Sequence, residues 1–402
     1  MLEDKSDSRQ GGESHRDSGN SLMTSATDNL LSRPPFSLNG TEKQKYLSGA
    51  VTESIAHHYE NCPPYRKWMN KQGFAPSTAF DDLSEIPYLP AALFKHMDLV
   101  VGEQDDIVKI LASSGVSSQI PSRVPIDNVT RTRQMKALTS VMSDFFGGKR
   151  RPFLLADVEP SRAEGNDVNL SARIAGMRGY LMAASQQVYI LDDVENQPRL
   201  NESLLQKTVE DFKISGTPFS VLGYTYMVYK YVIQPLYEQG ICLDFPEETF
   251  LLHFGGWKML QDQAVTREIL NEQASAVFGI PAGNVRDIYG FTEQLGVIYP
   301  DNGNGVKRTP CFSEVIVRDP LTLEPVPDGE YGLLEFITPL PNSYPGAALL
   351  LDDIGRIVTR EPGPDGKHGT SFEIIGRAPE SEVRGCGDTL PDHIYEISSD
   401  TN

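Results

Sequence analysis

Cysteine is scarce in this sequence of 402 residues, and long apolar runs are missing. The four cysteines, Cys62, Cys242, Cys311 and Cys386, lie far apart and form no Cys-x-x-Cys pair, which argues against a disulfide framework or a zinc site. No stretch reaches the roughly 18 uninterrupted apolar residues of a membrane helix, and residues 1–20 lack the apolar segment of a secretory signal. We therefore expect a cytoplasmic protein with reduced thiols and no membrane span.

Basic residues are also few. The chain has 36 Lys and Arg against 55 Asp and Glu, which gives a formal net charge of -19. A surface of this sign repels nucleic acid and anionic lipid, so we expect no nucleic-acid partner. A small anionic substrate remains possible, because a few local Lys, Arg and backbone N–H groups determine such a site.

Residues 1–42 are rich in Ser, Asp, Gly and Asn and poor in aromatics. This composition buries too little apolar surface to offset the entropy of ordering, so we predict a disordered tail. Beyond it, residues recur at helical spacing, namely Tyr46, Leu47, Val51, Ile55 and Tyr59. The stretch "ENCPPYRKWM" predicts the end of that helix and the start of another.

Strand-like runs alternate with helical stretches through the middle of the chain. The runs are "RPFLLADV", "QQVYILDD", "PFSVLGY", "ETFLLHFGG" and "VRDIYGF", and a helical stretch from Val129 to Phe146 precedes the first. The alternation predicts an α/β fold with largely parallel strands. After Pro310, short alternating runs such as "SEVIVRDP" and "YGLLEFITPL" are separated by turns, which indicates an antiparallel β region.

A small, polar stretch, "SSGVSSQIPS" at residues 113–122, follows the apolar run "IVKILA". A loop at the carboxyl end of a strand presents N–H groups and hydroxyls where open α/β sheets bind ligands, and such a loop can cradle phosphates. The same composition is typical of an ordinary Ser-rich surface turn. This stretch alone leaves both interpretations open.

Three further segments follow in order: "IYGFTEQ" at 288–294, "LLDDIGRIV" at 350–358 and "FEIIGRAPESEVRGCG" at 372–387. Together with the Ser-rich loop they resemble the core motifs of the adenylate-forming ligases. The stretches "HHYENCPPYR", "HFGGWK" and "GRAPESEVRGCG" narrow the resemblance to the acyl-protein synthetases of the bacterial bioluminescence fatty-acid reductase system, relatives of the phenylacetate–CoA ligases. The likeness runs from about Tyr46 to Thr389.

The resemblance implies an adenylating α/β domain over residues 43–355, with a β region from about residue 310, and a reduced C-terminal segment over residues 356–402. It implies ATP and Mg²⁺ as cofactors and a carboxylic acid as substrate. It also implies a partner that accepts the acyl group, such as an acyl reductase or a carrier protein.

Carried over residue by residue, the resemblance assigns Glu293 to magnesium, Thr292 to phosphate and Asp353 to the ribose hydroxyls. Tyr289, followed by Gly290, corresponds to the residue beside the adenine, and Arg377 belongs to the hinge pair. The other residues assigned to the nucleotide are Ser113, Ser114, Gly115, Ser117, Ser118, Gly255, Gly256, Trp257 and Arg356.

Two more residues are candidates for the chemistry. A carboxylate that attacks a phosphate is already ionised at pH 7, so catalysis consists mainly of positioning and of neutralising charge. No lysine follows Lys367, so Lys258 is the candidate for the cation that larger relatives supply from a C-terminal domain; the alternative is a surface lysine after a turn. Cys386, two residues from Arg384, is the candidate acyl acceptor, because a thiolate near positive charge is the best side-chain nucleophile for the task; the alternative is an unreactive thiol.

The resulting hypothesis is ATP-dependent activation of a carboxylic acid, fatty or other, followed by acyl transfer to the Cys386 thiol and on to a partner protein. One alternative is a phenylacetate-type acid–CoA ligase. The other is a non-catalytic adenylation-fold subunit of a reductase complex, which is favoured by Val116 and Ser118, where the family usually has Thr and Gly.

Overall fold

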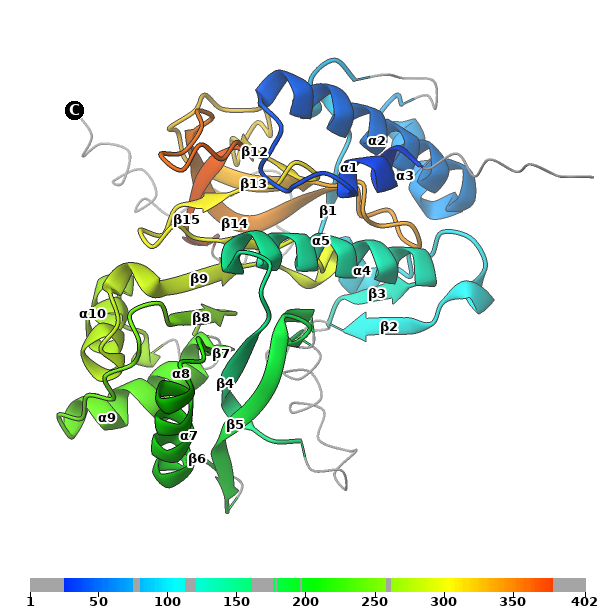
Figure 1. Ribbon diagram of the computed structural model, residues 1–402. Coiled ribbons are helices and arrows are strands. Elements are labelled where there is room, and N and C mark those ends of the chain that lie inside the picture. Colours follow the sequence, from blue (N-terminus) through cyan, green and yellow to red (C-terminus); the bar gives the residue numbers. More distant parts are fainter. Residues whose placement is uncertain are drawn as a thin grey trace, which may run out of the picture.

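The computed structural model describes residues 25–74, 80–112, 121–160, 176–177, 179–195, 197–257 and 262–378. Two large sheets lie one above the other in Figure 1, and helix α5 (Asn128–Phe146) crosses between them. The N-terminal helices cover the upper sheet, while the later helices flank the lower one. The long helix α5 therefore belongs to the boundary between the two layers.

The lower sheet has the parallel core that the sequence predicts. Its strand order is β10-β9-β8-β7-β4-β5-β6, and the neighbours from β9 to β5 are parallel. Every residue of the central strand β7 is buried, as in strands that are covered on both faces. The strands are β4 (Arg151–Val158), β5 (Ala184–Val194), β6 (Gln197–Leu200), β7 (Ser220–Tyr224), β8 (Phe250–Phe254), β9 (Val285–Tyr289) and β10 (Tyr299–Pro300).

The upper sheet is the predicted antiparallel region. Its strands are β11 (Lys307–Arg308), β12 (Glu314–Arg318), β13 (Gly332–Ile337), β14 (Ala348–Thr359) and β15 (Ser371–Arg377), with β1 (Leu89–Pro90) parallel to β14. The expected domain boundary between residues 355 and 356 is wrong, because it cuts β14, which pairs with β13 on one side and β15 on the other. The upper sheet therefore continues past residue 355, through the rest of β14 and through β15, to Arg377.

Aromatic side chains join the two sheets. The Tyr299 ring of β10 lies 5.1 Å from the Phe336 ring of β13 and 5.4 Å from the Phe372 ring of β15. Tyr289 of β9 lies 5.6 Å from Phe336. Because Tyr299, Phe336 and Phe372 are fully buried, this cluster fixes the end of β9 against the middle of the upper sheet.

The run "IVKILA" forms a strand, but not in the parallel sheet. Strand β2 (Lys109–Ala112) pairs antiparallel with β3 (Arg123–Ile126) in a separate two-stranded hairpin. The Ser-rich stretch connects these two strands, and its residues 113–120 lie outside the described part of the chain.

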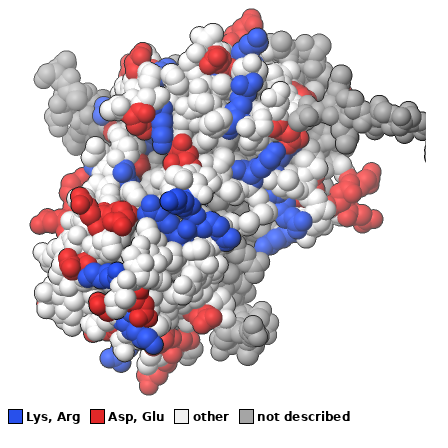
Figure 2. Space-filling view, viewed as in Figure 1, with Lys and Arg blue, Asp and Glu red and all other residues white. Residues whose placement is uncertain are grey.

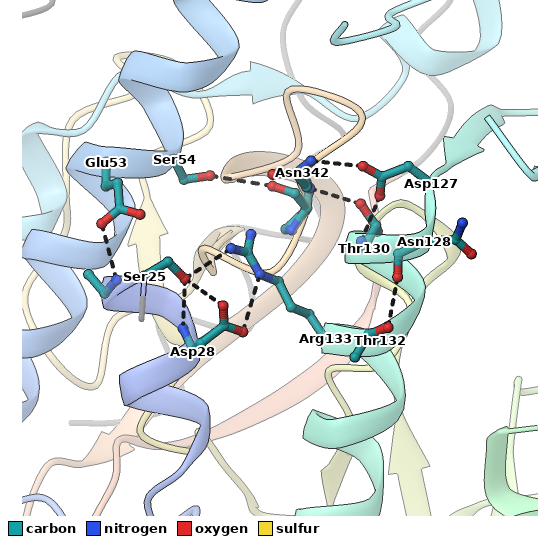
Figure 3. Close-up of polar contacts among 12 residues, drawn as sticks. Ser25, Asp28, Glu53, Ser54, Asp127, Asn128, Thr130, Thr132, Arg133 and Asn342 are labelled. Carbon is teal, nitrogen blue, oxygen red and sulfur yellow. Dashed lines mark hydrogen bonds and ion pairs between the residues drawn. The ribbon is translucent and has the colours of Figure 1, made fainter. Parts of the chain in front are cut away.

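The predicted tail is wrong from Ser25 onward. Helix α1 (Ala26–Leu31) begins at an N-cap in which the Ser25 hydroxyl accepts from the backbone N–H of Asp28, and Leu30, Leu31 and Leu38 are buried. Figure 3 shows how Arg133 of α5 reaches this segment: its Nη2 donates to Ser25 Oγ at 3.2 Å, and its Nε lies 3.7 Å from Asp28 Oδ1. Three buried leucines anchor this segment to the core. The average composition of residues 1–42 is polar and does not reveal them.

The remaining helices follow local signals in the sequence. Helix α2 (Gly40–Asn61) begins at a capping box of Asn39 and Glu42, and α3 (Pro63–Lys71) begins at the predicted Pro-Pro break. The other helices and turns are η1 (Leu83–Glu85), α4 (Leu93–His96), η2 (Gln104–Asp106), α7 (Glu202–Ser215), α8 (Thr225–Val228), η3 (Tyr229–Ile233), α9 (Gln234–Glu238), α10 (Arg267–Phe278), η5 (Ala282–Asn284) and η6 (Thr292–Gln294). Within the described ranges, none of the helices has the length and hydropathy to span a membrane.

Candidate active site

A cavity of about 900 Å³ lies at the carboxyl ends of β7, β8 and β9. The upper sheet contributes lining residues from β14 and β15, α5 contributes one wall, and the β2–β3 hairpin contributes another. Parallel strands bind ligands at this edge, because the loops that follow them converge there. Of the residues predicted from the sequence, the cavity brings together Gly255, Gly256, Trp257, Gly290, Thr292, Glu293, Asp353 and Arg377.

Among the described residues, four cationic side chains line the cavity against three carboxylates, Glu293, Asp352 and Asp353, although the chain as a whole is acidic. The cationic residues are Lys95, Lys109, Arg131 and Arg377, and Figure 2 shows Lys and Arg gathered across the middle of the face on which α5 lies. Among the described residues, the side chains of Lys95, Lys109 and Arg131 have no hydrogen-bond or ion-pair partner, although their backbone groups do. Unpaired cationic side chains at a cavity wall suit an anionic substrate. Their local field attracts the substrate although the net charge of the chain is negative.

The loop after β8 holds the first group of predicted residues. Gly255 and Gly256 have φ angles of 79° and 61°, a left-handed conformation that glycine adopts without strain. The chain therefore turns sharply at the end of the strand and places Trp257 on the cavity wall, where its ring packs edge-on against Tyr229 at 5.1 Å. Sequence reasoning found this turn through the double glycine.

Behind this loop lies a buried polar network. His253, two residues before Gly255, is 6% exposed, and its Nδ1 lies 3.0 Å from Thr225 Oγ1 and 3.8 Å from Asp287 Oδ1. Lys307 Nζ donates to the other Asp287 oxygen at 2.7 Å. Burial lowers the pKa of His253, so its ring is neutral at pH 7 and holds the end of β8 by hydrogen bonding.

The loop after β9 holds the second group. Thr292, Glu293 and Gln294 form the short turn η6, and the Gln294 amide donates to the carbonyl oxygens of Phe336 at 3.0 Å and Gly346 at 2.9 Å. Gly296 has a φ of 97°, and a Cβ there would lie 2.6 Å from the Gln134 Cα of α5. The loop is thus clamped between the upper sheet and α5, with Glu293 only 9% exposed on the cavity wall.

Asp353 is the centre of a three-residue contact. The Tyr289 hydroxyl donates to Asp353 Oδ2 at 2.7 Å, and Arg377 Nε donates to Oδ1 at 3.4 Å. Burial and the neighbouring carboxylate raise the pKa of Tyr289 well above its ordinary value, so the phenol stays protonated. Each carboxylate oxygen retains a further lone pair that can accept from a ligand hydroxyl.

Two predicted nucleotide contacts lie elsewhere. Arg356 Nε donates to Glu373 Oε1 at 2.6 Å across the β14–β15 ladder, and its guanidinium lies 4.9 Å from the centre of the Tyr331 ring. The Tyr289 ring belongs to the aromatic cluster that joins the sheets. Neither Arg356 nor Tyr289 is among the described residues that line the cavity. Tyr289 reaches the site through its hydroxyl and Asp353.

Several predicted residues lie outside the described ranges. They are Ser113, Ser114, Gly115, Ser117 and Ser118 of the Ser-rich loop, together with Lys258 and Cys386. Described residues next to the Ser-rich loop and next to Lys258 line the cavity. Leu111 and Ser122 lie on either side of the loop, and Trp257 precedes Lys258. The roles of all the predicted residues stay predictions.

Sequence reasoning missed the wall that α5 provides. Arg131, Gln134, Met135, Leu138 and Thr139 line the cavity from one face of this helix. The signal was present in the sequence, because these residues recur at spacings of three and four. It could not be distinguished from an ordinary amphipathic helix without the rest of the fold.

The start of α5 is fixed by the loop of residues 341–343. Asn342 Nδ2 donates to Asp127 Oδ2 at 2.8 Å, and Thr130 Oγ1 accepts from the backbone N–H of Asn342 at 2.9 Å (Figure 3). On the other side of this loop, His58 Nε2 donates to the carbonyl oxygen of Pro341 at 3.0 Å. The loop therefore ties α2 to the cavity wall.

The fold is the one found in solved adenylate-forming CoA ligases. A solved structure of 2-hydroxyisobutyryl-CoA ligase, in an open conformation with 2-HIB-AMP and CoA, superposes with a TM-score of 0.60 at 16% identity, over 92% of this chain and 83% of that one. Its post-adenylation state with 2-HIB-AMP gives a TM-score of 0.58, over 86% of this chain and 70% of that one. At this identity the likeness concerns the fold.

The family follows from the sequence match. The family model "Acyl-protein synthetase, LuxE" matches residues 16–395, and the chain belongs to this family. A long-chain-fatty-acid–luciferin-component ligase of Vibrio harveyi is 25% identical over 367 residues, 90% of this chain and 92% of the relative. The protein of the same name from Aliivibrio fischeri is 24% identical over 381 residues, 94% of this chain and 97% of the relative. The resemblance and the α/β fold class inferred from the sequence are thereby confirmed, and the protein is a ligase that uses ATP to activate an acid.

Proposed function

We propose that this protein converts a long-chain fatty acid into an acyl-adenylate with ATP and Mg²⁺, transfers the acyl group to its own Cys386, and passes it to a partner protein. The observation that carries the proposal is the convergence of Gly255, Glu293 and Asp353 on one cavity from three separate segments, in a chain of the acyl-protein synthetase family. The acid is taken from the name of the curated relatives.

The cavity fits ATP by the character of its walls. The Asp353 carboxylate, already oriented by Tyr289 and Arg377, has free lone pairs for ribose hydroxyls. The Gly255–Gly256 turn allows close approach of a ligand to the backbone. Lys95, Lys109 and Arg131 offer charge for phosphates from the described part of the chain, alongside the predicted role of Lys258.

Magnesium would rest on one protein carboxylate. The described residues contain no group of three His, Cys, Asp or Glu side chains able to hold a metal by themselves. A single carboxylate, that of Glu293, is enough for the usual arrangement of Mg²⁺, which takes one or two carboxylates together with water and phosphate oxygens. Bound there, the ion would neutralise charge on the phosphates.

The chemistry then requires little from the protein beyond placement. A carboxylate oxygen of the acid attacks the α-phosphorus of ATP, the bond to the bridging oxygen breaks, and pyrophosphate leaves. In the second step the thiolate of Cys386 attacks the acyl carbon, AMP leaves, and the thiol proton goes to solvent. The resulting thioester can transfer its acyl group to an acceptor protein.

The described cysteines support Cys386 by contrast. Cys62 and Cys311 are buried, and burial raises the pKa of both thiols, that of Cys311 to about 11. Thiols of this kind hold little thiolate at pH 7. Cys242 is exposed, but it is not among the described residues that line the cavity.

The test separates the two steps. Wild type should release pyrophosphate with ATP and a long-chain acid, and Glu293→Gln should release at least about tenfold less, because the charged ligand is lost. Cys386→Ser should still release pyrophosphate but retain no radiolabelled acyl group after denaturation, whereas the matched control Cys242→Ser should retain it. A hydroxylamine-sensitive label on Cys386→Ser would transfer the role to another cysteine, and formation of free acyl-CoA by wild type would favour the CoA ligase.

A further inference from the structure

One part of the cavity is apolar. We name it the apolar wall and define it by Met135, Leu138, Tyr180, Met182, Tyr224 and Phe254, all of which line the cavity. The Tyr180 ring stacks on Phe254 at 4.8 Å, and Tyr224 lies 4.6 Å from Phe254. Met135 and Met182 are 41% and 45% exposed, as side chains beside an open cavity are. The adenylation chemistry gives this wall no task.

Two glycines keep the apolar wall open. Gly176 and Gly179 lie in helical residues just before β5, and both line the cavity. An ideal Cβ on Gly179 would lie 2.6 Å from Leu138 Cδ1, and one on Gly176 would collide with the Tyr224 hydroxyl. Neither glycine has a positive φ, so the backbone does not require glycine. Alanine is the better helix former by about 1 kcal/mol. The presence of glycine at both positions is therefore explained by the space that a side chain would fill.

We infer that Gly176 and Gly179 determine how long an acyl chain the cavity accepts. This inference rests on the proposed function, because it takes the acyl chain to lie along the apolar wall. A methyl group at residue 179 must displace the end of Leu138, which is only 5% exposed and has the cavity as its open side. A methyl at residue 176 must displace the Tyr224 ring, whose hydroxyl is the colliding atom. Both changes shorten the space for the chain.

The experiment compares acids from octanoic to octadecanoic. Pyrophosphate release gives kcat/KM for each acid, and displacement of an anthroyloxy-stearate probe gives binding of each acid without ATP. The variants are Gly176→Ala and Gly179→Ala, with Gly49→Ala as the matched control, because a Cβ at Gly49 on α2 meets no atom within 4 Å. The double variant Gly176→Ala with Tyr224→Phe is the rescue, since the next atom, Tyr224 Cζ, would lie at an ordinary 3.4 Å from the new Cβ.

Each alanine variant should lose about tenfold or more in kcat/KM and in affinity for the longest acids, as expected for one methylene in a tight apolar pocket, and should keep wild-type values for short acids and for the KM of ATP. The rescue should recover the long acids. An equal loss at every chain length, an unchanged length profile, or no binding of any acid by wild type would overturn the inference. Wild type that binds acids without releasing pyrophosphate would refute the proposed adenylation, and the binding series would still decide about the glycines.

Discussion

His58 should make the stability of this protein depend on pH in a way that one substitution removes. Its ring is fully buried, and Nε2–H donates to the Pro341 carbonyl. Nδ1 is buried without a partner among the described residues. A second proton would therefore sit on a nitrogen that has no acceptor, and burial, with His57 nearby, lowers the pKa of His58 to about 3.

The magnitude follows from the two pKa values. The unfolded chain binds the proton near the ordinary pKa of 6.5, whereas the folded chain resists it down to about 3. The folded state thus keeps its full stability above pH 6.5 and loses it as the pH falls from there toward 3. The protonation of His58 in the unfolded chain lowers the free energy of unfolding at pH 5 by about 2 kcal/mol relative to pH 7.5.

The assay is urea unfolding of wild type and of His58→Gln between pH 5 and pH 8. Gln offers an amide N–H to Pro341 and does not titrate, so its free energy of unfolding should fall with acid by about 2 kcal/mol less than that of wild type. Because Pro341 begins the loop that fixes the start of α5, wild-type activity should fall in parallel. Identical pH dependence in the two proteins would refute the reasoning.

Two further outcomes test the site and the N-terminal segment. Asp353→Ala should raise the KM for ATP by about tenfold or more, because it removes a charged acceptor, with its melting temperature near that of wild type; an unchanged KM in steady-state kinetics would remove it from the nucleotide site. A chain that starts at Gly40 should unfold at a temperature several degrees below a chain that starts at Ser25, since burial of each of Leu30, Leu31 and Leu38 contributes about 1.5–3 kcal/mol. Calorimetry would contradict this if the two chains melted together.

The sequence by itself determined the elements and the order of the motifs. The strands of the parallel sheet could be read from "RPFLLADV" to "VRDIYGF" because each is an apolar run with turn signals at its ends. The motif glycines could be read because turns at Gly255 and Gly256 require a positive φ. Such signals are local, and a single segment carries each of them completely.

Only the tertiary structure decided which side chains share a space. Tyr289 and Asp353 are 64 residues apart, and the packing of β9 under the upper sheet brings them together. Arg356 lies three residues from Asp353 on the same strand, so its side chain leaves from the opposite face and pairs with Glu373. The Ser25–Leu38 segment is ordered by α5 and the core. The alternation of side chains along a strand determines which residues share a face. Long-range packing decides which other residues that face contacts.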